Sequence, residues 1–290
     1  MIDLHSHILP GIDDGARSLE QAVEMCRVAA AAGCEAMIAT PHQRRGEWWN
    51  CDRATIEVLR RRLQEAVGPE PRILSGGEIR VDAQLLAEIL ATNGRGHDAI
   101  NADSAGNAGN AGTAGKAGGV DHGDDDGEGP LPLAGSRYLL LEFGSAASPP
   151  EAADLVHELS VAGWRPVLAH PELISWMAED VAVVAHLVSL GAATQVTAMS
   201  VTGDFGRRAQ ADSHRLIELG LAHFVASDCH DLKRRPPGLA QAWKAIAASW
   251  GEEAARQLLL DNPRAVVADR PLPAYPAVGA AASAGLRLGR

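Results

Sequence analysis

The sequence has little of several features that would indicate other classes of protein. Its four cysteines show no short paired spacing, which is typical of a protein in the reducing cytoplasm. No run approaches the roughly 18 apolar residues of a membrane-spanning helix, and the N-terminus lacks the basic and apolar regions of a signal peptide. With a net charge of −11, the chain is not expected to bind nucleic acid.

The chain is long and apolar enough for one large domain, with 290 residues of which 46% are hydrophobic. One segment, residues 94–136, differs in composition, because it holds 12 of the 30 glycines and many acidic side chains. Such a segment cannot bury enough apolar surface to offset its ordering entropy, so it is predicted to be a disordered insertion. Residues 271–290 are rich in Pro, Ala and Gly and are predicted to form a flexible tail. A single domain over residues 1–270 is therefore expected.

The rest of the chain alternates short apolar stretches with longer helical patterns. Strands are predicted at residues 2–5, 35–40, 72–77, 138–143, 165–169, 192–197 and 222–227. Helices are predicted near residues 19–32, 52–67, 82–91, 151–162, 178–190, 206–219, 238–248 and 252–260. Ser18 and Gln21 have the spacing of a capping box for the first helix, and Gly33 is placed to end it. Repeated strand-then-helix units indicate an α/β fold with parallel strands. A closed barrel is the natural arrangement for seven such units, and a doubly wound open sheet is the alternative.

Histidines and carboxylates follow most of the predicted strands, on the face where parallel barrels hold their active sites. The candidate metal ligands are His5, His7, Asp14, His42, Glu78, Glu142, His170, Asp228 and His230. Imidazoles mixed with carboxylates suit Zn²⁺, Mn²⁺ or Fe²⁺, and nine ligands are enough for two or three ions. Clustered divalent ions favour hydrolysis of phosphate esters, because they lower the pKa of water and neutralise charge in the transition state.

Seven motifs together carry a family resemblance: HSHILPGIDDGARS, ATPH, SGGEIR, YLLLEF, LAHPE, SDCHDLKRRPP and DNPRAVV. The sequence resembles the CpsB/CapC/YwqE-type bacterial tyrosine phosphatases of the PHP (polymerase and histidinol phosphatase) superfamily. The resemblance covers the chain apart from the insertion and the tail. It implies a distorted seven-stranded (β/α) barrel of PHP type with a trinuclear site that often holds Mn²⁺.

The resemblance also implies roles for individual residues. One ion would be held by His5, His7, Glu78 and Asp228, a second by Glu78, Glu142 and His170, and a third by Asp14, His42 and His230. Arg235 matches an arginine that contacts the phosphate. The implied partner is a phosphotyrosine protein, such as the C-terminal tail of a tyrosine kinase of capsule or exopolysaccharide synthesis. Self-association into an oligomer is left open.

Two sequence features keep other interpretations open. Family members commonly carry an arginine where "HPELIS" has Leu173, which leaves a phosphatase for a small ester such as histidinol phosphate as an alternative. A metal-bound but inactive regulatory module is another. Cys229 and Arg235 also have the C-x5-R spacing of cysteine-dependent tyrosine phosphatases, but the loop between them contains no glycine to cradle a phosphate.

Overall fold

The structure, a computed structural model, describes residues 1–44, 46, 51–82, 85 and 130–273. Its strands are β1 (Ile2–Ser6), β2 (Ala36–Ala39), β3 (His42–Gln43), β4 (Arg72–Ser75), β5 (Glu78–Arg80), β6 (Tyr138–Glu142), β7 (Arg165–Ala169), β8 (Ala193–Thr197) and β9 (Phe224–Ala226). Its helices are α1 (Leu19–Ala31), α2 (Arg53–Val67), η2 (Leu133–Gly135), α5 (Pro149–Val161), η3 (Pro171–Leu173), α6 (Ser175–Glu179), α7 (Val181–Ser189), α8 (Ala198–Thr202), α9 (Arg207–Glu218), α10 (Leu239–Trp250), α11 (Glu252–Arg256), η4 (Gln257–Asp261) and α12 (Asn262–Val267).

All the strands that pair in the described residues are parallel, as the sequence predicts. They form two sheets, with the strand orders β1-β2-β4 and β3-β5-β6-β7-β8-β9. The chain passes from the first sheet to the second directly, because β3 follows β2 and β5 follows β4 after short breaks. An isolated bridge between Ser6 and Cys229 links the end of β1 to the chain three residues after β9. Each predicted strand is present, but within the described residues the pairing gives two sheets and not the predicted closed barrel.

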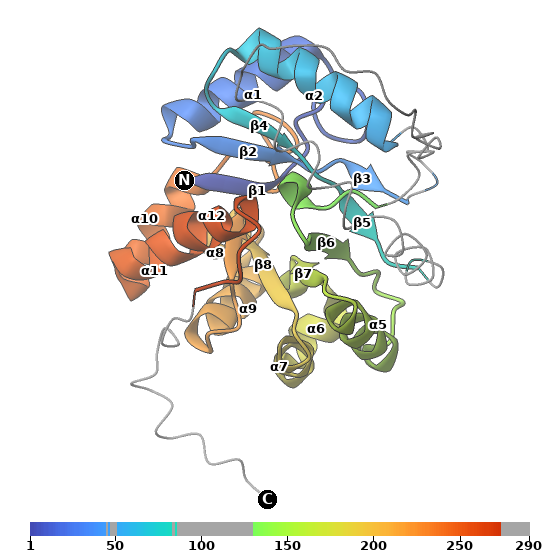
Figure 1. The fold of residues 1–290 in the computed structure, drawn as a ribbon. Helices are drawn as coiled ribbons and strands as arrows, with labels where there is room; N and C mark the ends of the chain where they lie inside the picture. Colours follow the sequence, from blue (N-terminus) through green and yellow to red (C-terminus); the bar gives the residue numbers. More distant parts are fainter. Residues whose placement is uncertain (45, 47–50, 83–84, 86–129, 274–290) are drawn as a thin grey trace, which may run out of the picture.

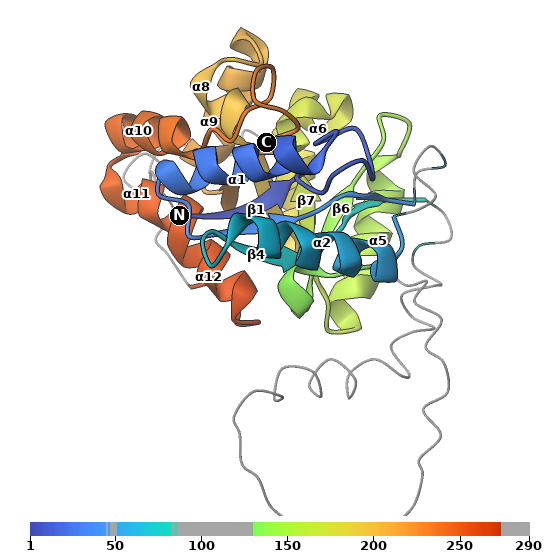
Figure 2. The same ribbon diagram turned by 90° about the horizontal axis from the view of Figure 1, so that it is seen from above.

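Strand β6 shows why the sequences of these strands are continuous apolar runs. Leu139 and Leu141 pack into the large core between strands and helices, together with residues of α5. Tyr138 and Leu140 point the other way, into a second core that also contains Phe224 of β9. A strand that is buried on both faces needs apolar residues at successive positions. Figures 1 and 2 show α1 and α2 covering the sheet of β1, β2 and β4, while α5, α6 and α7 flank β6 and β7.

The first helix follows its predicted boundaries. The Ser18 hydroxyl accepts a hydrogen bond from the Gln21 backbone N–H at 3.3 Å, and the helix ends just before Gly33, whose φ is +87°. Only half of the predicted capping box forms, because the Gln21 side chain accepts from the backbone N–H of Arg17 instead of Ser18. Most of the helix predicted over residues 82–91 lies outside the described residues. In the part of the chain that the structure describes, no helix is both long and apolar enough to cross a membrane.

The described chain resumes inside the segment that the sequence assigns to the insertion. Leu131 and Leu133 are buried, and the Leu131 backbone N–H donates to Gln43 Oε1 at 2.8 Å. Residues 130–136 therefore belong to the packed domain, since their leucines contribute to its core. The predictions for residues 94–129 and 274–290 lie outside the described residues.

Candidate metal centre

The structure brings the nine predicted ligands together on the side of the fold where β1, β2, β4, β6, β7 and β9 end. His42 and Glu78 begin the short strands β3 and β5, which follow β2 and β4. The nine ligands come from β1 and the loop after it, from β3, β5 and β6, and from the chain directly after β7 and β9: His5, His7, Asp14, His42, Glu78, Glu142, His170, Asp228 and His230. Seven of them line a pocket of about 370 Å³, and His5 and His7 lie beneath it in contact with Glu78. Parallel strands that end at one edge place these distant residues side by side.

His5 and His7 bring their Nε2 atoms face to face. His5 Nδ1 donates to Gln195 Oε1 at 2.9 Å, and His7 Nδ1 donates to Asp13 Oδ2 at 2.8 Å. When both rings are neutral, as metal binding requires, this arrangement leaves the two Nε2 atoms, 3.1 Å apart, free of protons. Asp228 Oδ1 lies 3.4 Å from each of them. Lone pairs and a carboxylate that converge in this way fit a bound cation.

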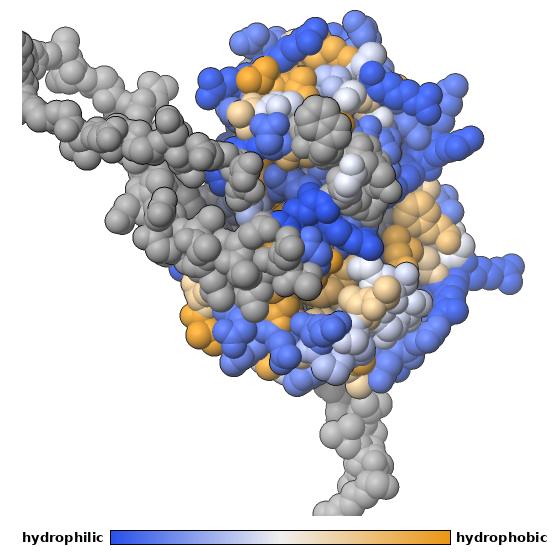
Figure 3. Space-filling view, turned by 90° about the vertical axis from the view of Figure 1, so that its right-hand side faces the viewer, coloured by the Kyte–Doolittle hydropathy of each residue, from blue (hydrophilic) through white to orange (hydrophobic). Residues whose placement is uncertain are grey.

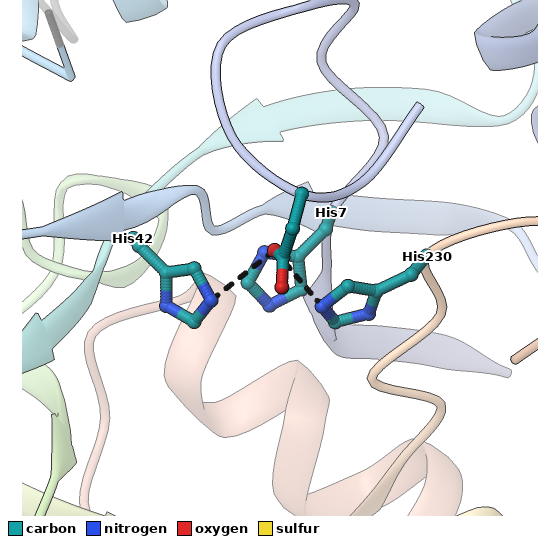
Figure 4. A group of neighbouring side chains, drawn as sticks. His7, His42 and His230 are labelled. Atoms are coloured by element: carbon teal, nitrogen blue, oxygen red, sulfur yellow. Dashed lines mark ion pairs between the residues drawn. The ribbon is translucent and has the colours of Figure 1, made fainter. Parts of the chain in front are cut away.

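Asp14 lies between two further histidines. Its Oδ1 atom is 3.3 Å from His42 Nε2 and 3.2 Å from His230 Nε2, and Figure 4 shows the two rings on either side of this carboxylate. The loop that carries Asp14 folds tightly back on β1. A Cβ atom on Gly15 would lie 2.0 Å from the His7 carbonyl oxygen, so this close approach requires glycine.

Glu78 is the central carboxylate of the cluster. It is the parallel-strand partner of His42, and its Oε2 atom lies 2.7 Å from His42 Nδ1. Its Oε1 atom lies 2.9 Å from His170 Nε2 and 3.5 Å from His5 Nε2. A Glu142 carboxylate oxygen lies within 4.8 Å of donor atoms of Glu78 and His42. Glu78 is thus placed to bridge two ions.

Two ligands sit in backbone conformations that non-glycine residues seldom adopt. His170 has a φ of +36° and Asp228 a φ of +52°. Their backbone N–H groups donate to Gln195 O and His5 O, both at 2.8 Å, which ties each turn to a neighbouring strand. Strained backbone of this kind is concentrated at functional sites, where the surrounding fold enforces it.

The cluster keeps its carboxylates ionised. Burial raises the pKa of Glu78, but the nearby imidazoles of His5, His170 and His42 outweigh it and hold the pKa well below its usual range. Burial also raises the pKa of Asp228, while His5, His7 and Arg235 outweigh that effect and lower it. Burial lowers the pKa of His170, yet Glu78 raises it to about 9. The ionised carboxylates are stabilised by nearby positive charge. Divalent cations can supply this charge in place of the protons on the imidazoles.

The donor set fits divalent metal ions. Three groups of ligand atoms lie within 4.8 Å of one another: His7, Asp14, His42 and His230; His5, His7 and Asp228; and His42, Glu78 and Glu142. These groups overlap the three ligand sets that the family resemblance implies. They differ at the second ion, where His42 takes the place of His170 beside Glu78 and Glu142. His170 still contacts Glu78 at 2.9 Å. Mixed imidazole nitrogens and carboxylate oxygens suit Zn²⁺, Mn²⁺ and Fe²⁺.

Sequence reasoning missed three residues of the site. Asp13 and Gln195 orient the rings of His7 and His5, and Arg80 lines the pocket. Each had a signal in the sequence. Asp13 belongs to an acidic pair before a glycine, Gln195 is a polar residue inside an apolar strand, and Arg80 follows Glu78 by two positions in β5, which places both on one face.

Arg235 and Leu173 line the same pocket. One amino group of the Arg235 guanidinium contacts Asp228 Oδ2, and the other lies 3.2 Å from His230 Nε2. The Leu173 side chain is 42% exposed and brings no charge. Cys229 is fully buried, and burial raises the pKa of its thiol well above the usual value. A protonated, inaccessible thiol is unsuited to act as a nucleophile.

Known proteins resemble this chain over nearly its whole length. It is 33% identical over 256 residues to the tyrosine-protein phosphatase YwqE of Bacillus subtilis, covering 87% of this chain and 86% of that protein. It is 27% identical to the tyrosine-protein phosphatase CpsB of Streptococcus pneumoniae, covering 93% and 99%.

A solved structure agrees with these relatives. In work on YwqE from Bacillus subtilis and CpsB from Streptococcus pneumoniae, described as unique metal-dependent tyrosine phosphatases, one chain superposes on this one with a TM-score of 0.77 at 30% identity. The superposition covers 94% of this chain and 96% of that one. The model of the family "Capsular polysaccharide synthesis, CpsB/CapC" matches residues 1–95 and 126–268. The chain belongs to the CpsB/CapC family.

Proposed function

We propose that this protein is a metal-dependent phosphomonoester hydrolase that acts on phosphotyrosine in proteins. The observation that carries the proposal is the convergence of nine imidazole and carboxylate ligands at one edge of the sheets, beside an arginine in an open pocket. The relatives YwqE and CpsB, which are named tyrosine-protein phosphatases, support the same reaction.

The proposed cofactor is two or three divalent ions, with Mn²⁺ as the expected metal. His5, His7 and Asp228 would hold one ion, Glu78 and Glu142 a second with His170 nearby, and Asp14, His42 and His230 a third. Bound divalent ions lower the pKa of water and neutralise the charge that develops on phosphoryl oxygens.

The residues of the chain bind and orient the substrate in this scheme. Arg235 donates charge-assisted hydrogen bonds to the phosphoryl oxygens, and its contact with Asp228 fixes its direction. Phe143, Ile174 and Leu173 are among the residues that line the pocket, and their apolar side chains suit an aromatic leaving group. The phenolate of tyrosine, with a pKa of about 10, leaves more readily than an alkoxide.

The proposed partner is a phosphotyrosine protein of the cytoplasm, with the C-terminal tail of a tyrosine kinase of capsule or exopolysaccharide synthesis as the expected substrate. A flexible tail suits an open pocket, because an extended peptide can reach the metal centre without displacing the fold.

The proposal is tested by comparing kcat/KM on a phosphotyrosine peptide and on histidinol phosphate, each with Mn²⁺ and with a chelator. We expect turnover of the peptide that depends on metal and exceeds turnover of histidinol phosphate. Faster turnover of histidinol phosphate would favour the small-molecule phosphatase instead. No turnover of either substrate by a protein that retains its metal would favour the inactive regulatory module.

A further inference from the structure

The pocket at the metal centre contains a second arginine. Arg80 is two residues beyond Glu78 in β5, so its side chain leaves the strand on the same face as that carboxylate. It lines the pocket together with Arg235, and its side chain remains 35% exposed. Figure 3 views the side of the molecule toward which β3 and β5 run in Figure 1, and hydrophilic residues occupy the centre of this face.

The fold holds the Arg80 guanidinium in a defined place. Glu142 is its directly opposite partner in β6, and Arg80 Nη1 lies 3.4 Å from Glu142 Oε2. On its other side the guanidinium lies against the backbone of Gly144, where a Cβ atom would come within 2.4 Å of Nη2. A guanidinium carries five N–H donors, so one carboxylate contact leaves donors for another anion.

The charge around the pocket favours such an anion only once metal is bound. Four carboxylates line it, those of Asp14, Glu78, Glu142 and Asp228. Divalent ions would neutralise them and leave the two guanidinium groups as surplus positive charge. Arg235 already contacts Asp228 and His230, whereas Arg80 makes a longer contact of 3.4 Å with Glu142.

We propose that Arg80 is a phosphate-binding residue, and that Arg80 and Arg235 together bind the phosphoryl group of the substrate. Planar guanidinium groups bind phosphoryl oxygens through paired N–H donors. Two arginines on one phosphoryl group would provide the charge that Leu173 does not. This inference rests on the proposed phosphatase function.

The test measures binding of inorganic phosphate to the Mn²⁺-loaded protein by titration calorimetry, together with its metal content. For Arg80→Ala we expect phosphate affinity and kcat/KM on a phosphotyrosine peptide to fall about ten-fold or more, with unchanged metal content. Arg80→Lys keeps a charge without the planar fork, and it should recover part of this loss.

A second variant moves the guanidinium without removing its charge. Gly144→Ala places a methyl group where Arg80 Nη2 lies, and the flexible side chain must shift away. Phosphate affinity should fall by a smaller factor than in Arg80→Ala, and combining the two substitutions should add nothing further. Arg264→Ala, which removes an arginine paired with Glu35 outside the pocket, is the control and should bind phosphate like the wild type.

Three results would overturn the inference in different ways. If Arg80→Ala lost metal but bound phosphate normally once reloaded, Arg80 would only position Glu142. If the metal-loaded wild type neither bound phosphate nor hydrolysed the peptide, the proposed function would fail and this inference with it. An active wild type with an unaffected Arg80→Ala would overturn this inference alone.

Discussion

The two ends of the parallel strands have opposite chemistry. At the carboxyl ends, ionised carboxylates and imidazoles crowd around a pocket of about 370 Å³, and two ligands have positive φ. At the amino ends, a cavity of about 490 Å³ has mostly apolar residues such as Pro166, Ile217 and Leu258 in its lining.

At the amino ends, polar groups beside the cavity bond to residues near the end of the described chain. Arg165 pairs with Asp269 at 3.1 Å, and the Tyr138 hydroxyl donates to the Arg270 carbonyl oxygen at 2.8 Å. One end therefore concentrates charge that suits a cation, while at the other end Arg137 and Arg165 pair with Asp269 within the protein. This difference indicates that the carboxyl ends serve chemistry and the amino ends serve stability.

Substitution of Glu78 is expected to have the largest effect on the metal centre. Glu78→Gln removes the charge that lies between His42, His170 and His5, so a bridged metal should be lost. Turnover should fall by at least about three decades, because a bound metal contributes several kcal/mol to transition-state stabilisation. Metal analysis and single-substrate kinetics on the purified variant measure both effects.

Cys229→Ala provides the matched control for Glu78→Gln. Its thiol is buried directly after the ligand Asp228 but takes no part in the proposed chemistry, so activity should stay within a few-fold of wild type. Loss of turnover in Cys229→Ala with full metal content would support a cysteine nucleophile and contradict the metal-dependent mechanism.

Substitution of Asp13 tests whether metal binding depends on residues that hold the candidate ligands in place. Asp13 accepts a hydrogen bond from His7 Nδ1 and from the backbone N–H groups of Gly15 and His42. Asp13→Asn should weaken metal binding by about 10–100-fold, because the tautomer and orientation of His7 lose their support. Titration with Mn²⁺ against a competing chelator measures the change, and an unaltered affinity would show that His7 needs no such partner.

Substitution of Leu173 tests whether an added positive charge at the pocket improves catalysis. An arginine at this exposed position beside the pocket can donate charge-assisted hydrogen bonds to a phosphoryl group. Leu173→Arg should raise kcat/KM on a phosphotyrosine peptide about ten-fold, since about 1.4 kcal/mol corresponds to one decade. No gain on the peptide, combined with fast wild-type turnover of histidinol phosphate, would contradict the tyrosine-phosphatase proposal.

His223 tests the stabilising role of the amino end. Burial lowers the pKa of this imidazole from 6.5 to about 4, and its Nδ1 accepts a hydrogen bond from the Thr194 backbone N–H at 3.2 Å. Between these two pKa values the unfolded chain binds a proton that the folded chain does not. The free energy of unfolding should therefore decrease as pH falls from about 6.5 to about 4, by at most about 3 kcal/mol.

His223→Gln keeps a hydrogen-bond acceptor without the titration. Its unfolding free energy, measured with denaturant over this pH range, should vary less than that of the wild type. Its turnover at pH 7 should match the wild type, because His223 lies at the opposite end from the metal centre. An unchanged pH dependence would show that the imidazole is not responsible.

Local patterns predicted much of this architecture. Strands buried on both faces, such as β6, read as apolar runs, and the cap at Ser18 and the stop at Gly33 marked α1. The nine candidate ligands lie together because strand ends converge in a parallel α/β fold, and their role as metal ligands stays a prediction. The breaks between β2 and β3 and between β4 and β5 contain Pro41 and the pair Gly76 and Gly77, which are typical strand breakers. These residues mark the breaks, but they do not show that the strands after them join a different sheet.

Two of the three missed residues, Gln195 and Arg80, share a physical reason. They act through partners far away in the chain, His5 and Glu142. The order of strand neighbours decides which of these residues meet, and periodicity within a single strand does not contain that information. The sequence assigned Leu131 and Leu133 to the insertion, whereas the structure buries both in the core. This packing depends on the positions of other strands and helices, which the local sequence does not contain.

Anomalous scattering at the manganese absorption edge, from crystals of the protein grown with Mn²⁺, tests most directly whether the nine ligands form a metal centre. We predict two or three anomalous peaks among these ligands at the carboxyl ends, with Glu78 between two of them. The peaks should be absent from crystals of Glu78→Gln or weaker there. Crystals without a peak inside this cluster, or with peaks only at the amino-end cavity, would contradict a metal centre at the carboxyl ends.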